Sequence, residues 1–140
     1  MKITVGGRRR NIKKLYDKTI RAVYKDPRVH AALNCASLSC PRLPRNAFDP
    51  KRLDEQFDGA MREFVSDERH VRIDEARRVV RLSKIFDWFT KDFIDYETRA
   101  GNPDPNLIDF INRYRPTESR IPRDYRIKFL PYDKDINKQS

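Results

Sequence analysis

The residues that could carry out chemistry are concentrated between positions 26 and 44. This stretch, DPRVHAALNCASLSCPRLP, holds both cysteines and one of the two histidines of the chain. A cysteine thiolate is a nucleophile, and histidine is the side chain that acts most readily as a base near neutral pH. His30, Cys35 and Cys40 are therefore candidate residues for a hydrolase or an acyl transferase.

Local geometry separates His30 from Cys35. Residues 29–36 are small and largely apolar, which predicts a buried strand. On a strand, alternate residues share a face, so His30 and Cys35 would point in opposite directions, whereas His30 and Asn34 would share a face. A helix would not bring His30 and Cys35 together either, because five positions correspond to about 140° of rotation. A catalytic partner for either residue must come from elsewhere in the chain.

Each candidate also has a structural interpretation. Cys35 is expected to be a small core residue, and Cys40, next to Pro41, is the more accessible of the two cysteines. A disulfide between them requires the loop to fold back until the Cα atoms are within about 7 Å. His30 could be a core histidine that is hydrogen bonded to the backbone. These alternatives stay open at the level of sequence.

A metal site is not predicted. His30 and the two cysteines offer three ligands, but they lack the Cys-x2-Cys spacing of structural zinc sites. His70 lies in a charged run. We therefore expect neither a metal nor a cofactor.

The remaining sequence predicts the elements that must position these residues. Asn11 and Ser83 are expected to cap helices, and Asp87, Asp92 and Asp133 are interpreted as helix and turn carboxylates. The expected elements are a strand at 2–5 closed by Gly6 and Gly7, helices at 12–23, 49–65, 84–93 and 105–114, a hairpin at 70–74 and 79–82, and a half-buried strand at 125–129. This order predicts an α+β domain in which a small antiparallel or mixed sheet packs with about four helices. We expect one domain at 1–133 and a polar tail at 134–140.

Composition limits the possible partners. The chain has 140 residues and a formal net charge of +10, with the basic excess concentrated in the first 25 residues. Clustered cations suit nucleic acid or an anionic membrane, but no nucleic-acid motif is present and the aromatic residues are at core spacings, which argues against nucleic acid. No apolar run approaches the roughly 20 residues of a membrane span, and no signal peptide is recognisable. Export is expected only if the chain is a fragment of a longer precursor.

Three segments together resemble a known family. The stretch at 26–44, the run VVRLSKIFDWFTKDF and the closing IKFLPYDKDIN are similar to the bacterial and plant domain of unknown function 547 (DUF547) family. The resemblance implies that the upstream helices of the family, with their Trp-Ile-Asn and Tyr-Asn patterns, are missing here. Lys134 stands where the family typically has Trp.

The resemblance implies a fold distantly like papain and transglutaminase. In such a fold His30 would be the base and Asn34 would share its strand face, and the nucleophile would be Cys40 or lie upstream. Three functions therefore remain open. The first is a non-catalytic binding or scaffold module with an unknown protein or peptide partner, the second a Cys/His-dependent hydrolase or acyl transferase, and the third a basic surface for nucleic acid or anionic membrane.

Overall fold

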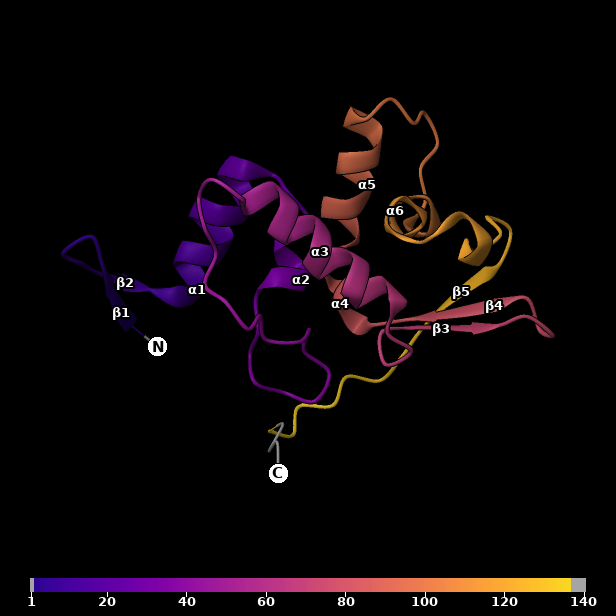
Figure 1. Ribbon diagram of the computed structural model, residues 1–140, viewed down its shortest axis with the longest axis horizontal. Coiled ribbons are helices and arrows are strands. Elements are labelled where there is room, and N and C mark those ends of the chain that lie inside the picture. The colour runs from indigo at the N-terminus through magenta and orange to yellow at the C-terminus, as the bar shows by residue number, and fades with distance from the viewer. Residues whose placement is uncertain (1, 137–140) are drawn as a thin grey trace.

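The computed structural model describes residues 2–136, and Figure 1 shows the arrangement of their elements. Residues 2–136 combine runs of helices with two small sheets, which confirms the predicted α+β class. The elements are β1 (Lys2–Val5), β2 (Arg8–Asn11), α1 (Ile12–Leu15), the π-helix η1 (Tyr16–Tyr24), α2 (Val29–Ala32), α3 (Leu53–Ser66), β3 (Val71–Asp74), β4 (Val79–Leu82), α4 (Lys84–Trp88), α5 (Thr90–Arg99), α6 (Leu107–Tyr114), the 3-10 helix η2 (Thr117–Ser119) and β5 (Arg126–Phe129).

A three-stranded mixed sheet and the longer helices enclose the core. β3 pairs with β4 in antiparallel fashion, and β5 pairs with β4 in parallel fashion. The inward side chains of this sheet meet one face each of α3, α5 and α6. The largest fully buried members are Phe86, Phe93, Phe110, Met61 and Leu82. Burial of each such side chain stabilises the fold by about 1.5–3 kcal/mol, so this cluster is the main source of stability.

Two predicted helix caps are confirmed. The Asn11 side chain accepts a hydrogen bond from the Lys14 amide (3.2 Å), and Ser83 Oγ accepts one from the Ile85 amide (3.3 Å). The predicted start of the last helix at Pro105 is wrong, because Asn106 caps α6 and forms a capping box with Asp109. This box satisfies two amides that a start at Pro105 would leave without partners.

The predicted strand at 29–36 is wrong. Val29–Ala32 form the short helix α2, and an irregular loop follows. The His30 amide donates to the Pro27 carbonyl (3.1 Å) and the Leu33 amide to the Val29 carbonyl (3.1 Å). Proline fixes a backbone angle that suits the first turn of a helix, and a short apolar run does not by itself distinguish a helix from a strand.

Other boundaries also differ from the predictions. The helix expected at 84–93 is divided at Phe89 into α4 and α5, and the helix expected from residue 49 begins at Leu53. The Asp49 carboxylate instead accepts from the Lys51 amide (2.9 Å) in a local turn. Strand β2 was not expected, because three consecutive arginines lack the alternation of a half-buried strand.

The chain end returns to the loop that follows α2. Residues 130–136, here called the C-terminal strap, run back from β5 beneath α3 and α4 (Figure 1). The Leu38 amide donates to the Asp135 carbonyl (2.9 Å), and Ser37 and Ile136 form a β-bridge. Of the predicted tail at 134–140, residues 134–136 therefore belong to the strap, and 137–140 lie outside the described residues.

Within residues 2–136, no helix has the length and apolar character that a membrane crossing requires.

Two glycines should respond in opposite ways to alanine. Gly59 is exposed inside α3, and a Cβ added there would meet no atom within 4 Å. Gly59→Ala should raise the free energy of unfolding by about 1 kcal/mol, because glycine is a poor helix former. Gly101 has φ +94, a backbone conformation that L-residues avoid, so Gly101→Ala should lower it by about 1 kcal/mol. Urea-induced unfolding measures both; changes of the same sign would contradict the assigned backbone.

Candidate functional site

His30 is held by side chains from two other elements. Its ring nitrogen Nδ1 lies 2.5 Å from the Tyr16 hydroxyl of η1, and Nε2 lies 2.8 Å from Oδ2 of Asp92 on α5. The carboxylate of Asp92 can only accept, so Nε2 carries the proton. In the neutral imidazole Nδ1 then accepts from Tyr16. The network runs from the tyrosine hydroxyl through the imidazole to the carboxylate.

Arg21 completes this network from η1. Its guanidinium donates from Nε to Asp92 Oδ2 (2.9 Å) and from Nη2 to Oδ1 (3.1 Å). Such two-pronged, charge-assisted contacts are among the strongest side-chain hydrogen bonds. The ring of Phe89 packs against both groups: it stacks on His30 at 4.0 Å between ring centroids, and the Arg21 guanidinium lies 4.6 Å from its centroid. Phe89, at the break between α4 and α5, thus covers the network with an aromatic ring.

Burial sets the protonation states. The His30 side chain has no exposed surface, and burial lowers its pKa to about 4 despite the hydrogen bond to Asp92. Burial also raises the pKa of Tyr16 above its ordinary value. Burial acts to raise the pKa of Asp92, but the hydrogen bonds from Arg21 and His30 hold it below its ordinary value. At neutral pH the site therefore contains a neutral histidine, a neutral tyrosine, a carboxylate and a guanidinium.

The order of groups is that of a catalytic triad, with a tyrosine in the place of the nucleophile. Catalysis by this route requires a hydroxyl that loses its proton easily and an imidazole that substrate can approach. Tyr16 has the opposite pKa shift, and His30 is sealed. A cavity of about 310 Å³ beside the network is lined by Arg21 and Asp92 but not by His30. The arrangement is suited to joining η1, α2 and α5.

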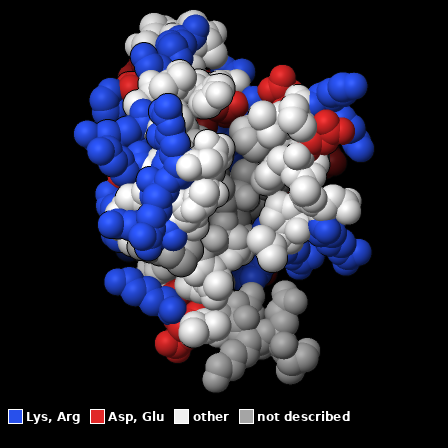
Figure 2. All heavy atoms as spheres, turned by 90° about the vertical axis from the view of Figure 1, so that its left-hand side faces the viewer, with Lys and Arg blue, Asp and Glu red and all other residues white. Residues whose placement is uncertain are grey.

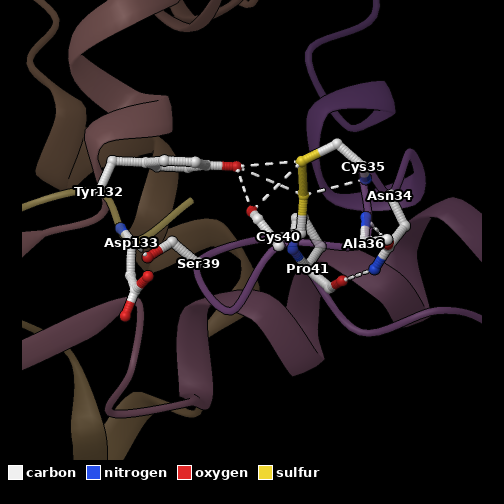
Figure 3. Close-up of a disulfide and its surroundings, with 9 residues drawn as sticks. Asn34, Cys35, Ala36, Ser39, Cys40, Pro41, Tyr132 and Asp133 are labelled. Atoms are coloured by element: carbon white, nitrogen blue, oxygen red, sulfur yellow. Dashed lines mark hydrogen bonds between the residues drawn. A yellow bond between two sulfur atoms is a disulfide. The ribbon is translucent and has the colours of Figure 1, made fainter. Parts of the chain in front are cut away.

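The cysteines form a disulfide, with their Cα atoms 6.1 Å apart. Tyr132 of the C-terminal strap points its hydroxyl at this bond, 3.2 Å from Cys35 Sγ and 3.3 Å from Cys40 Sγ (Figure 3). Ser37 Oγ donates to the Tyr132 hydroxyl (2.9 Å), and Ser39 Oγ accepts from the Asp133 amide (2.8 Å). The disulfide loop and the strap therefore form one cluster.

Three expectations about this loop are corrected. Cys35 was expected in the core and is exposed, whereas Cys40 was expected to be accessible and is 5% exposed. Asn34 does not share a face with His30, because it lies in the loop after α2, where its side chain contacts the Pro41 carbonyl and the Ala36 amide. A disulfide sulfur is not a thiolate, so neither cysteine is a nucleophile in this oxidised form.

The sequence interpretation missed Asp92 and Tyr16 as partners of His30. Tyr16 was expected only as part of the helix at 12–23, and Asp92 was interpreted only as a helix or turn carboxylate. One signal was present: Asp92 lies three positions after Phe89 and next to Phe93, on the apolar side of its helix. A carboxylate in that position requires a buried partner.

An apolar groove lies between η1, α2 and α3. It has a volume of about 470 Å³, and it is lined mainly by apolar and aromatic side chains, namely Ile20, Tyr24, Val29, Ala32, Leu33, Phe48, Leu53 and Phe57, together with Asp26 and Asp54. Tyr24, Leu33 and Leu53 at its border are exposed by 74%, 42% and 38%. This is the concave, apolar type of surface at which ligands bind. Among residues 2–136, no three His, Cys, Asp or Glu side chains are grouped as a metal site requires.

The fold and the two clusters define an α+β domain with a buried histidine network and a disulfide loop. Residues 1–65 match the family described as "Protein of unknown function, DUF547". This match confirms the resemblance over the part of the chain that contains His30 and both cysteines. Residues 66–136, for which the resemblance was also predicted, lie outside it. No curated protein and no solved structure matches the chain. The likeness to papain and transglutaminase folds stays a prediction.

Acidification should destabilise the protein already at pH values above those at which carboxylates take up protons. The pKa values of His30 and His70 are lowered by burial to about 4, so between pH 6.5 and 4 the unfolded chain binds protons that the folded chain does not. The free energy of unfolding should fall across this window, by up to the order of 3 kcal/mol per histidine. Urea unfolding at pH 7, 5.5 and 4.5 measures this.

A single substitution distinguishes the contributions of the two histidines to the pH dependence of stability. His70→Phe keeps a ring packed on Phe64 and should retain about half of the pH dependence, because only His30 still titrates. Constant stability of the wild-type protein between pH 6.5 and 4.5 would contradict the burial of both imidazoles.

If the disulfide forms, the protein has no free thiol and gains part of its free energy of unfolding from the bond. Thiol titration of the oxidised protein in denaturant should find no free thiol. The Cys35→Ser/Cys40→Ser double variant should lower the free energy of unfolding by about 2 kcal/mol, the value for closing so short a loop. Two free thiols in protein purified without reductant would contradict the bond.

Proposed function

We propose that this domain is a non-catalytic binding module that accepts a peptide segment of a partner protein. The observation that carries the proposal is the apolar groove, at whose border the side chains of Tyr24, Leu33 and Leu53 are exposed to solvent. The state of the candidate catalytic groups also supports the proposal, because the His30 side chain is buried and the two cysteines are joined in a disulfide.

Charge at the groove defines the chemistry of the partner. Arg28 binds the carboxylates of Asp26 (2.6 Å), Asp54 (2.7 Å) and Asp58 (2.8 Å). Asp58 also pairs with Arg62 (3.7 Å), so three carboxylates face two guanidinium groups. Asp26 and Asp54 line the groove, and the side chain of Asp54 is 92% exposed. The surplus charge at the border is therefore negative, although the chain as a whole is basic. The complementary partner presents apolar side chains next to a lysine or arginine.

Peptide binding tests the proposal directly. The probe is acetyl-Leu-Lys-Phe-Leu-Lys-amide, and its counterpart has aspartate in place of both lysines. Titration of ¹⁵N-labelled protein should move the amide resonances of Leu33, Leu53 and Phe57 with the lysine peptide, and the aspartate peptide should bind at least tenfold more weakly because it meets like charge.

A matched pair of variants locates the site. Leu53→Asp places a charge in the groove, and an acidic residue in the first turn of α3 suits the helix dipole, so the fold should persist. This variant should lose at least tenfold in affinity. Leu43→Asp changes a residue that is 70% exposed and lies outside the groove, so its affinity should equal that of wild type.

Two results would overturn the proposal. The first is equal affinity of the Leu53→Asp and Leu43→Asp variants, or no binding of either peptide. The second is cleavage or acylation of the peptide in a mass spectrum, abolished by His30→Gln, which would favour the hydrolase or acyl transferase.

A further inference from the structure

The N-terminal segment forms a second charged surface, away from the apolar groove. Its exposed cations lie on the β1–β2 hairpin and on the helical segment that follows it, and Figure 2 shows Lys and Arg side chains gathered on this side of the molecule. We call the set Lys2, Arg8, Arg9, Arg10, Lys14 and Lys18 the basic ribbon surface. Among residues 2–136, none of them forms an ion pair with a carboxylate of the described chain, whereas their neighbour Lys13 binds Asp17 (2.6 Å).

Part of this surface is concave. A cavity of about 310 Å³ lies where the hairpin meets α1 and η1, and its lining comprises Arg9, Arg10, Asn11, Lys14, Leu15, Lys18 and Thr19. The lining thus contains four cations and two neutral hydrogen-bonding side chains, and it contains no carboxylate. Arginine and lysine around a recess of this kind recognise phosphate groups.

The hairpin itself has no core. Every residue of β2 is exposed, and the strand pair projects from the body of the molecule (Figure 1). An isolated two-stranded hairpin is marginally stable in water, so a charged one gains stability when a partner of opposite charge covers it. In the β1–β2 register Thr4 is opposite Arg9 and Ile3 is opposite Arg10. Since alternate residues point to opposite faces, Arg9 lies on one face of the ribbon and Arg8 and Arg10 lie on the other.

We propose that the basic ribbon surface binds duplex DNA, with the hairpin in the major groove and Lys14 and Lys18 on the adjacent phosphates. The major groove of B-DNA is about 12 Å wide and admits a two-stranded β-ribbon, one face of which then meets the base edges while the two edges of the ribbon lie beside the two phosphate rows. A membrane is flat and would contact only one face. Residues 2–11 contain no aromatic side chain on which single-stranded bases could stack, and the major groove of duplex RNA is too deep and narrow.

The sequence alone argued against nucleic acid, because it showed no motif and no aromatic residues between the cations. The ribbon adds what the sequence prediction lacked, since β2 was not expected. This proposal is independent of the peptide-binding function, because the two surfaces share no residue.

Fluorescence anisotropy with a labelled 20-base-pair DNA duplex tests the proposal on the full chain. Affinity should fall steeply with salt, with a slope of log K against log salt of up to about −5 if all six cations contact phosphates. The Arg8→Gln/Arg9→Gln/Arg10→Gln variant should lose at least tenfold in affinity at 50 mM salt, and its slope should be shallower by about 3.

A control variant distinguishes the effect of the ribbon cations on DNA affinity from the effect of the net charge of the chain. Arg120→Gln/Arg126→Gln/Lys128→Gln removes the same charge from exposed residues that lie elsewhere on the chain, and it should bind DNA within twofold of wild type. The Lys14→Gln/Lys18→Gln variant should lose affinity without altering the hairpin, so a loss in both ribbon variants is not a folding defect. Far-UV circular dichroism of each variant should match that of wild type.

The same assay also tests the alternative binding partners. Equal loss in the ribbon and control triple variants would overturn the proposal, and so would the absence of DNA binding at 50 mM salt. Tighter binding to a single-stranded oligothymidine, to duplex RNA or to vesicles containing 30% phosphatidylserine than to duplex DNA would overturn it as well.

Discussion

The arrangement of the N-terminal half depends on the hydrogen bonds that both ring nitrogens of His30 form. Tyr16 on η1 occupies one nitrogen and Asp92 on α5 the other, so residues far apart in the sequence are joined through a single imidazole. Leaving either nitrogen without a partner in this buried position would cost about 1–3 kcal/mol, which is why the three elements must keep their positions. Arg21 binds the same carboxylate, and the ring of Phe89 packs against both Arg21 and His30. A residue that the sequence offers as a catalytic base is thereby used to hold the fold together.

The second constraint is the closure of the loop after α2. The disulfide limits its conformations, and the C-terminal strap covers it through Tyr132 and the bridge between Ser37 and Ile136. With the loop fixed on one side and His30 fixed on the other, Ala32 of α2 and the following Leu33 line the groove beside α3. The shape of the groove thus depends on two anchors that both derive from the stretch at 26–44.

Local signals in the sequence predicted local structure well and long-range structure poorly. Asn11 and Ser83 were recognised as caps because a helix cap requires only a hydrogen bond between a side chain and an amide two or three residues away. The stretch at 29–36 was misassigned because its apolar run fits a strand as well as a buried helix, and the exposures of Cys35 and Cys40 were reversed as a result. The partners of His30 depend on long-range contacts with η1 and α5, and the position of Asp92 on the apolar side of its helix was the one local signal for them. The disulfide was left open for the same reason, since it depends on how the loop folds back.

His30 is a sealed, neutral histidine that joins three elements of the fold. The most direct measurement is the ¹⁵N spectrum of its imidazole between pH 5 and 8. We predict a fixed Nε2–H tautomer across this range, with an Nε2 proton that exchanges slowly because water does not reach it. An imidazole that titrates near pH 6.5 and exchanges its proton rapidly would contradict the burial of His30 and would restore this residue as a candidate general base.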